Sequence, residues 1–397
     1  MEKPAIEGGK PVRKKFLPYG HQSIDEKEIN EVIDSLKSNW ITTGPKMRSF
    51  EENFKKYIGS KFAVAVNSGT AALHISTSSI NIKPGDEVIT TPLTFVASAN
   101  CVVYRGGTPI FADIKKNTYN IDPEEVKSKI TSKTKALIPV HFAGQPCDMD
   151  EISEIAKEND LIVIEDAAHA IDAKYKGKKI GTLSDLTIFS FHPVKNMTTA
   201  EGGMVTTNDD NLYEKLLMFR THGISKDAQK RFGKSGGYYY DMQYLGFRYN
   251  LSELHASLGI HQLAKLESFQ KRRREVVKIY NKELKNIEEL SIPFVKKDVK
   301  HSWHLYVIQL NLEKLRVDRD YIFKALREEN IGVNVHYIPV HYHSYYQNKF
   351  GLKKGILPNV ERLYPRLLTI PLFHSMSDDD VYDVINALEK ILKYYKK

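Results

Sequence analysis

The sequence has 397 residues, of which 41% are hydrophobic, so the chain can bury a large core, and its length predicts one large domain and a smaller one. The formal net charge is +9, but Lys and Arg are interspersed with Asp and Glu, a pattern that favours a solvated surface over a nucleic-acid-binding face. No apolar run reaches the roughly 20 residues of a membrane span and no apolar signal core follows Met1, so we expect a cytoplasmic globular protein without a membrane or nucleic-acid partner.

The first 22 residues are polar and irregular, which predicts an N-terminal arm that lies over another part of the molecule. Ser23 and Glu26 have the spacing of a capping box. A first helix is predicted after them by apolar residues at helical spacing, Ile29, Val32, Ile33 and Leu36. Residues 40–45 then indicate a loop. A second helix, closed by Gly59, is expected to present to the core Phe50, Phe54, Tyr57 and Ile58.

From residue 61 to about residue 208, short apolar runs alternate with helical segments. The runs predict strands at residues 62–66, 87–90, 109–113, 136–140, 161–165, 186–189 and 204–207. This alternation indicates a mostly parallel sheet that helices cover on both faces. No glycine-rich dinucleotide fingerprint follows the first strand, so a nicotinamide site is not expected.

Residues 220–250 have weak periodicity and many tyrosines, and a long irregular segment inside a compact domain is more often functional than idle. Residues 251–287 indicate two successive helices that lead to a smaller α+β domain. In that domain we expect strands at residues 303–310 and 332–339 and helices at about 318–329 and 377–395. The expected divisions are therefore an arm (1–22), a large domain (23–262) and a small domain (263–397).

Lys195 lies in the stretch SFHPVKNMTTAEGG, between the expected end of one strand and a glycine pair that leads into the next. A free lysine amine titrates near ~10.4, so a nucleophilic lysine needs burial or a carbonyl cofactor, of which pyridoxal phosphate is the commonest. Asp166 follows an apolar strand run, where open α/β sheets bind ligands, and a carboxylate there can pair with a protonated pyridine nitrogen. Gly69 and Thr70 open a helix whose free amides can hold a phosphate. Three pieces of one cofactor site are thus expected at three strand ends.

The chain resembles the DegT/DnrJ/EryC1/StrS family of pyridoxal phosphate-dependent sugar aminotransferases in five motifs, which keep the family's order. They are NSGTAALH (67–74), TPLTFVASAN (91–100), EDAAHA (165–170), FSFHPVKNMTTAEGG (189–203) and GFRYNLSELHASLG (246–259). The resemblance covers nearly the whole chain and implies the aspartate aminotransferase-like fold, fold type I. Within the family, the chain most resembles enzymes that aminate C4 of UDP-linked 4-keto-6-deoxy-N-acetylhexosamines, such as the pseudaminic acid pathway transaminase.

The resemblance implies roles for single side chains around the cofactor. Thr70 and Ala71 match positions near the phosphate, and Ser190 matches the serine that donates its hydroxyl to it. Phe95 matches the aromatic residue that stacks on the cofactor ring, although a phenylalanine in a βα unit is otherwise a core residue. The remaining matches are Asp166 for the partner of the pyridine nitrogen, His169 for the position, often glutamine, beside the 3-hydroxyl, and Lys195 for the Schiff-base lysine.

The resemblance also implies substrate contacts in three loops. Thr43 and Gly44 lie in the ITTGP loop that borders the sugar-nucleotide pocket, whereas these residues alone also fit a tight Gly-Pro turn. His192 either orients a substrate hydroxyl or phosphate or satisfies a turn. His336 and Tyr337 belong to the HYIPVH tract at the sugar-nucleotide site, and the histidines of this tract have no standard zinc spacing, so no metal is expected.

A partner subunit is implied by the same resemblance. In the family, the segment that matches residues 220–250 reaches the partner's active site, and Asn250 matches a residue that contacts the neighbour's cofactor phosphate. The resemblance therefore implies a homodimer with shared active sites, and symmetric dimers are the commonest soluble oligomers.

The reaction implied by the resemblance moves an amino group from glutamate to C4 of a UDP-linked keto sugar, with Lys195 as proton carrier. No base-reading residue is evident, so dTDP- and GDP-linked sugars remain alternatives. A sugar dehydratase of the same family would have histidine in place of Lys195. A cysteine desulfurase would need a mobile nucleophilic cysteine, and neither Cys101 nor Cys147 lies in an evident catalytic loop. A basic binding protein on this scaffold would need neither Lys195 nor Asp166.

Overall fold

The structure, a computed structural model, describes residues 2–225, 238 and 240–397. Within these residues, seven strands form the central sheet in the order β1-β9-β8-β5-β4-β2-β3. Their bounds are Phe62–Val66 (β1), Glu87–Thr90 (β2), Thr108–Phe111 (β3), Thr134–Ile138 (β4), Ile162–Asp166 (β5), Leu186–Ser190 (β8) and Gly203–Thr207 (β9). The pairs from β8 to β3 are parallel, and β9 is antiparallel to both neighbours. The predicted mostly parallel sheet is confirmed, and each strand lies within two residues of its predicted bounds.

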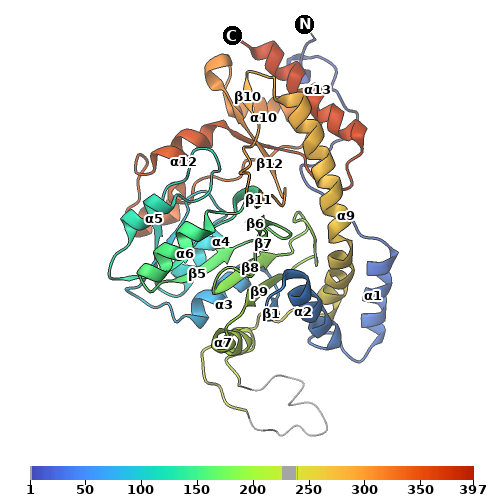
Figure 1. The fold of residues 1–397 in the computed structure, drawn as a ribbon. Coiled ribbons are helices and arrows are strands. Elements are labelled where there is room, and N and C mark those ends of the chain that lie inside the picture. Colours follow the sequence, from blue (N-terminus) through green and yellow to red (C-terminus); the bar gives the residue numbers. More distant parts are fainter. Residues whose placement is uncertain (1, 226–237, 239) are drawn as a thin grey trace.

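Helices cover both faces of this sheet (Figure 1). One face packs against α2 (Pro45–Ile58), α6 (Met149–Glu158) and the first half of α9 (Glu253–Leu284), with α5 (Pro123–Lys129) at its margin. The other face packs against α3 (Gly69–Ser79), α4 (Ala97–Tyr104) and α7 (Asp210–Arg220). Residues of β1 alternate between the two cores, Ala63 and Ala65 in the first and Val64 and Val66 in the second, as the two-residue period of a strand requires.

The first two helices differ from each other in what their apolar residues contact. α2 ends at Gly59, whose φ is 93°, and buries Phe50, Phe54 and Ile58 as predicted. α1 (Glu26–Lys37) is capped by Asp25 and Glu28, so the predicted capping box of Ser23 and Glu26 was wrong by two residues. The Asp25 carboxylate accepts from the Lys27 amide at 2.9 Å. Three of the four apolar side chains of α1 are exposed, namely Ile29, Ile33 and Leu36 at 42%, 38% and 60%, whereas Val32 is half-buried.

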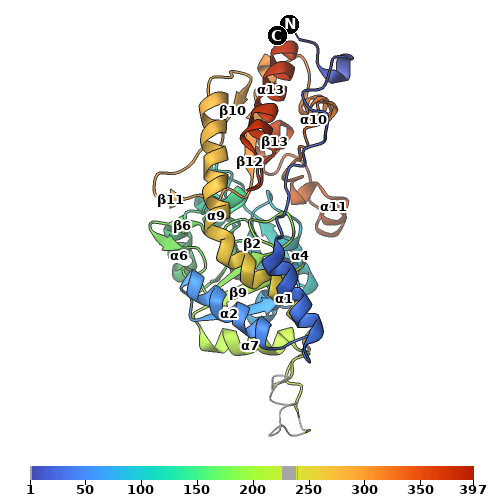
Figure 2. The ribbon, with the colours of Figure 1, turned by 90° about the vertical axis from the view of Figure 1, so that its right-hand side faces the viewer.

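α9 is one helix of 32 residues, so the two successive helices predicted for this stretch were wrong. Its first half buries side chains in the core on the central sheet, and we call the region around this core the large part. Its second half, with Val276 and Tyr280, lies in a separate core, and we call the region around that core the small part. Gly259 does not break the helix; it lets Phe50 approach, since a Cβ at Gly259 would lie 2.7 Å from the Phe50 ring. The predicted boundary at residues 262 and 263 falls inside this helix, which runs along both parts (Figure 2).

The small part contains a three-stranded antiparallel sheet in the order β10-β12-β13. Its strands are Leu290–Ser291 (β10), Tyr306–Leu310 (β12) and Leu367–Ile370 (β13), and its helices are α10 (Arg319–Glu328), α11 (Ser344–Phe350), α12 (Pro358–Leu363) and α13 (Asp378–Tyr395). The predicted helices at 318–329 and 377–395 are confirmed. The predicted strand at 332–339 is wrong, because the Gly332 amide is bonded to Leu17 and only Asn334 forms a bridge, with Thr369.

Short 3₁₀ turns and a small second sheet complete the described elements. The turns are η1 (Ala5–Glu7), η2 (Phe142–Gly144), η3 (Leu312–Lys314), η4 (Val340–Tyr342) and η5 (Tyr364–Arg366). The sheet, in the order β11-β6-β7, is formed by β6 (Lys174–Tyr175), β7 (Lys178–Lys179) and β11 (Val299–Lys300). Because β11 follows α9 and β6 follows β5, this sheet ties the small part to the large one.

The N-terminal residues lie on the small part. The buried Glu329 carboxylate accepts hydrogen bonds from the amides of Ala5 and Val12 at 2.8 Å each, and Arg13 pairs with Asp380 and Asp383 at 2.7 Å. This path leads the chain to Tyr19, which lines the cavity described below. The first residues therefore lie over another part of the molecule, in the manner expected of an arm.

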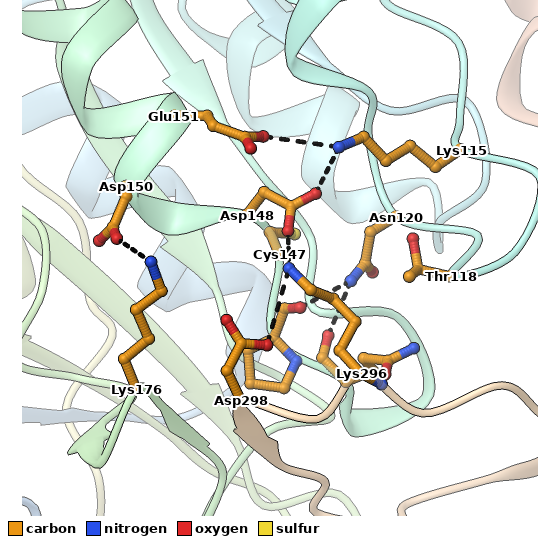
Figure 3. Close-up of polar contacts among 12 residues, drawn as sticks. Lys115, Thr118, Asn120, Cys147, Asp148, Asp150, Glu151, Lys176, Lys296 and Asp298 are labelled. Atoms are coloured by element: carbon orange, nitrogen blue, oxygen red, sulfur yellow. Dashed lines mark hydrogen bonds and ion pairs between the residues drawn. The ribbon is translucent and has the colours of Figure 1, made fainter.

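An ion cluster joins the two parts beside β11 (Figure 3). The Asp148 carboxylate, at the start of α6, pairs with Lys296 from the segment after α9 and with Lys115 at 2.6 Å. The backbone is joined as well, since the Gln145 side chain donates to the Phe294 carbonyl and accepts from the Lys296 amide, both at 3.0 Å. We call Lys115, Asp148 and Lys296 the junction cluster.

Part of the predicted functional segment 220–250 lies outside the described residues, namely 226–237 and 239. Of its described residues, Ile224 bridges to Met242 and Thr221 to Arg248.

None of the described helices is long and apolar enough to cross a bilayer.

Candidate active site

A cavity of about 430 Å³ lies at the carboxyl ends of β5 and β8, between the large part and residues of the small part. Open α/β sheets bind ligands at this edge because the strands end there while the connections diverge. Nine of the predicted site residues line the cavity, namely Thr70, Phe95, Asp166, His169, Ser190, His192, Lys195, His336 and Tyr337. They come from five separate stretches of the chain.

Lys195 lies on a turn that follows β8, where its amide donates to the His192 carbonyl at 2.9 Å. Burial lowers the pKa of its amine to about 8, against the opposing charge of Asp166. At pH 7 about a tenth of such amines are unprotonated, compared with about one in two thousand for a free lysine. The cavity therefore holds an amine that is ready to act as a nucleophile or as a base.

Asp166 is the last residue of β5 and is only 5% exposed. Its Oδ2 accepts from the Ser98 hydroxyl at 2.7 Å and its Oδ1 from the Ala168 amide at 3.1 Å. Burial raises the pKa of Asp166, and the two hydrogen bonds and the charge of Lys195 act against that rise. A cationic ring nitrogen beside this carboxylate would give it the direct charge partner that a buried carboxylate needs.

The start of α3 also forms part of the cavity wall. Ser68 caps the helix by accepting from the Ala71 amide at 3.0 Å, which leaves Gly69 and Thr70 on the cavity wall. Gly69 is required here because a Cβ would lie 2.9 Å from the Cβ of Ser190. The positive end of the helix dipole and the Ser190 hydroxyl together suit a phosphate group.

Three buried histidines lie near Lys195. Burial holds the pKa of His169 and of His304 well below the usual range and lowers that of His336 to about 3, so all three are neutral at pH 7. His169 Nε2 lies 3.0 Å from the Tyr337 hydroxyl, and the rings of His169 and His304 are 4.4 Å apart. His336 Nδ1 bonds to the Thr369 hydroxyl at 2.9 Å.

Phe95 lies at the cavity wall and is 58% exposed, so it is not a core residue in the described chain. Its ring centroid lies 6.1 Å from that of Tyr337. An aromatic face with so little protein against it is available for a planar ligand.

Four predicted residues lie outside this cavity, and their roles stay predictions. Ala71 is buried, with its amide used by the Ser68 cap. Gly44 caps α2, where a Cβ would lie 2.9 Å from the Glu253 carboxyl, and Thr43 precedes it in the same loop. Asn250 bridges to Val66, and its Oδ1 is buried without a partner among the described residues.

Sequence reasoning missed several residues of the cavity, among them Tyr19, Ser98, His304 and Asn334. Ser98 had a signal, because it lies in the same TPLTFVASAN motif as Phe95. Tyr19, His304 and Asn334 had no local signal. They reach the cavity through the packing of the arm and the small part.

The sequence model of the DegT/DnrJ/EryC1/StrS aminotransferase family matches residues 22–389. The chain belongs to this family. The chain is 48% identical, over 96% of its length and 98% of the relative's, to the spore coat polysaccharide biosynthesis protein SpsC of Bacillus subtilis. The family and its solved structures support a sugar aminotransferase of fold type I, as the sequence predicted.

Two solved structures have the same fold as this chain over almost their full length. Spr1654 of Streptococcus pneumoniae, described as a sugar aminotransferase and solved in a PMP form, is 32% identical, with a TM-score of 0.89 over 95% of this chain and 99% of that chain. PseC of Helicobacter pylori, an aminotransferase of pseudaminic acid biosynthesis, is 30% identical, with a TM-score of 0.88 over 96% and 100%. Spr1654 was also solved in a PLP form, so the family structures are consistent with the predicted cofactor, pyridoxal phosphate.

The residues of this family member fit that cofactor. A reactive amine, a buried carboxylate and a helix N-terminus line one cavity, as an aldehyde, a pyridine nitrogen and a phosphate would require. Burial raises the pKa of both Cys101 and Cys147, so neither thiol is a ready nucleophile. Among the described residues, no group of three or more His, Cys, Asp and Glu side chains is arranged to hold a metal.

Proposed function

We propose that this chain is a nucleotide-sugar aminotransferase that moves an amino group from glutamate to C4 of a UDP-linked 4-keto-6-deoxy-N-acetylhexosamine. The observation that carries the proposal is the amine of Lys195, with a pKa of about 8, in the same cavity as the buried carboxylate of Asp166. The product would be a 4-amino sugar for a surface glycan. We place the enzyme in the cytoplasm.

Pyridoxal phosphate, when bound, supplies an electron sink for a carbanion. Lys195 would hold the cofactor through Nζ and, once released, would carry a proton between the reacting carbon and the cofactor, a task suited to an amine with a pKa near the working pH. Asp166 would keep the ring nitrogen protonated. Thr70 and Ser190 would hold the phosphate, and Phe95 would cover the ring.

The sugar substrate is supported by the relatives rather than by one residue. SpsC is named for spore coat polysaccharide biosynthesis, and PseC for pseudaminic acid biosynthesis. His192, His336 and Tyr337 on the cavity wall would contact the sugar nucleotide, as would Thr43 and Gly44 from the loop before α2. A UDP-linked sugar is our first choice, with dTDP- and GDP-linked keto sugars as the alternatives.

We also propose that the enzyme is a homodimer with shared active sites. The exposed apolar side chains of α1 and the loop that follows it, which include Leu36, Trp40 and Ile41, are exposed at 60%, 40% and 55% and need a covering surface. Asn250 would donate from its Nδ2 amide, which in this chain donates to the Thr221 hydroxyl at 3.3 Å, to the partner's cofactor phosphate. Thr43 and Gly44 lie in the loop between these apolar residues and α2. A dimer contact that covers the apolar residues would therefore also bring Thr43 and Gly44 to the partner's cavity.

The test is an absorbance spectrum of the purified protein reconstituted with pyridoxal phosphate, before and after glutamate is added. A band near the visible edge that glutamate shifts to the pyridoxamine form is the expected result, followed by turnover with one of a set of UDP-, dTDP- and GDP-linked 4-keto sugars. A protein that stays colourless with pyridoxal phosphate would contradict the proposal. Turnover of a dTDP- or GDP-linked sugar alone would replace the nucleotide and keep the reaction.

A further inference from the structure

The contact between His169 and Tyr337 is the one polar pair in the cavity wall that joins the large part to the HYIPVH tract through two side chains among the described residues. His169 follows β5 and is 5% exposed. Its Nε2 lies 3.0 Å from the Tyr337 hydroxyl, and its Nδ1 is buried without a hydrogen-bond partner among the described residues. The ring therefore has one hydrogen-bonded nitrogen, Nε2, and one nitrogen without a partner among the described residues, Nδ1.

The direction of this hydrogen bond follows from the number of groups that each choice leaves unpaired. If Tyr337 donates to Nε2, the His169 proton must lie on Nδ1, and one donor remains unpaired. If Nε2 donates to Tyr337, the tyrosine proton and the Nδ1 lone pair both remain unpaired. Tyr337 is half-buried, and its hydroxyl has no other hydrogen-bond partner among the described residues. An unpaired buried group costs about 1–3 kcal/mol, so donation by Tyr337 is favoured. Burial also raises the pKa of Tyr337, which keeps its proton available.

The titratable groups around His169 do not supply a different partner. They are Lys195, His304, His336 and Tyr337. His304 lies with its ring 4.4 Å away and tilted by 45°, and its own Nδ1 also has no partner among the described residues. The unpaired Nδ1 of His169 therefore requires an acceptor that the described chain does not provide.

We propose that Tyr337 is a positioning residue whose hydroxyl fixes His169 in the Nδ1–H tautomer, so that Nδ1 donates a hydrogen bond to the 3-oxygen of pyridoxal phosphate. This inference rests on the proposed function, because it needs the cofactor in this cavity. It adds a reason for Tyr337 beside substrate contact. A glutamine at position 169 always carries an amide donor, whereas a neutral histidine has one on Nδ1 only when its tautomer is set.

The test compares Tyr337→Phe in the wild-type and His169→Gln backgrounds, each reconstituted with pyridoxal phosphate, by absorbance titration of the lysine-bound cofactor. A donor at the 3-oxygen stabilises its negative charge and weakens its hold on the neighbouring imine proton. Tyr337→Phe should remove this charge-assisted hydrogen bond. The apparent pKa of the lysine-bound cofactor should therefore rise by about one unit. In the His169→Gln background the same substitution should cause no shift, because the amide donor does not depend on Tyr337.

Tyr280→Phe is the matched control, since Tyr280 is buried in the small part and its hydroxyl donates to the Pro371 carbonyl at 2.8 Å. It should leave the titration unchanged. An equal shift from Tyr337→Phe in both backgrounds, or no shift in either, would overturn the inference while leaving the proposed function intact. A wild-type protein with no lysine-bound chromophore would instead remove the proposed function.

A second measurement needs neither the loaded enzyme nor the Tyr337 variant. The ¹⁵N shifts of histidine-labelled protein without cofactor report which ring nitrogen carries the proton, and His169→Gln identifies the signal by its disappearance. We expect the Nδ1–H tautomer at His169. Finding the proton on Nε2 would overturn the inference directly.

Discussion

The cavity and the junction cluster both contain lysine and aspartate side chains, but the pKa values of these side chains shift in opposite directions at the two places. Burial opposes the charged forms of Lys115, Lys296 and Asp148, yet their mutual ion pairs outweigh it, so the pKa of each lysine is raised and that of Asp148 is lowered. In the cavity, burial dominates, so the pKa of Lys195 falls and that of Asp166 rises. The cluster keeps its groups charged, and the cavity drives its groups toward neutrality.

The difference shows how pairing separates structural from reactive groups in one protein. The Asp148 carboxylate has an ammonium group on each side (Figure 3). In the cavity, the Nδ1 atoms of His169 and His304 have no partner among the described residues. Perturbed, unpaired groups in a cavity indicate a site that a ligand completes, whereas paired groups at a junction indicate stabilisation.

The largest expected effect follows removal of the cavity amine. Lys195→Ala should lower turnover by about 10³-fold or more, because proton transfer by a positioned base alone contributes about 10²–10⁴-fold. Cofactor should still bind through Asp166 and the start of α3, without the lysine-bound absorbance band. Lys282→Ala, at a lysine that is 77% exposed on α9, is the control and should behave as wild type. Near-normal transamination by Lys195→Ala would show that another group carries the proton.

Asp166→Asn should lower the rate of the glutamate half-reaction by about 10–100-fold, since a hydrogen bond to a charged group contributes about 1.5–3 kcal/mol. The reason is that a neutral amide holds the ring nitrogen proton less strongly than a carboxylate does. Single-turnover absorbance measures this rate. Asp160→Asn is a matched control, because Asp160 is exposed and its φ of 52° suits asparagine. Equal rates for the two variants would remove Asp166 from the mechanism.

The rate at which pyridoxal phosphate condenses with the cofactor-free protein should rise about tenfold between pH 7 and pH 9, with a midpoint near 8. The unprotonated amine is the nucleophile, and its fraction follows the lowered pKa of Lys195. Since the folded state holds this amine less strongly protonated than the unfolded chain, the stability of the cofactor-free protein should also gain from Lys195 between pH 8 and about 10.5. Stopped-flow absorbance measures the rate, and a midpoint near 10 would show that burial does not act on this amine.

The smallest expected effect on activity belongs to the junction cluster. Asp148→Asn should lower the free energy of unfolding by about 1–3 kcal/mol, because two lysines lose their carboxylate partner, and should change turnover less than about twofold. The pKa of Asp148 is lowered in the folded state, so its contribution is present above the unfolded pKa of about 3.9 and is lost as the pH falls through the folded value. Urea titrations at neutral pH and near pH 3 measure both.

Asp150→Asn is the matched control for that experiment. Asp150 pairs with Lys176 at 2.6 Å, but the two side chains are 63% and 53% exposed, and exposed pairs contribute about 0–1 kcal/mol (Figure 3). Its loss should change the free energy of unfolding by about 0.5 kcal/mol or less. A similar loss of stability in both variants would contradict the distinction between the partly buried cluster and its exposed neighbour.

The sequence by itself determined the central sheet, the strand-end placement of Asp166 and the candidacy of Lys195. These follow from local patterns, because apolar strand runs and the residues that directly follow them reach the same edge of a parallel sheet. The second helix and its Gly59 ending were equally local. The cofactor roles of Thr70, Ser190 and Phe95 came from resemblance, and the structure brings all three to the cavity wall.

Only the tertiary structure decided which distant residues complete the cavity. Tyr19 arrives with the arm, His304 with the segment before β12, and Asn334 with a stretch that the sequence predicted as a strand. In that stretch the Gly332 amide bonds to Leu17 of the arm, and only Asn334 forms a bridge, with Thr369. α9 continues through both parts because each half finds a core to pack against. Such outcomes depend on contacts between residues far apart in the chain, which no local pattern contains.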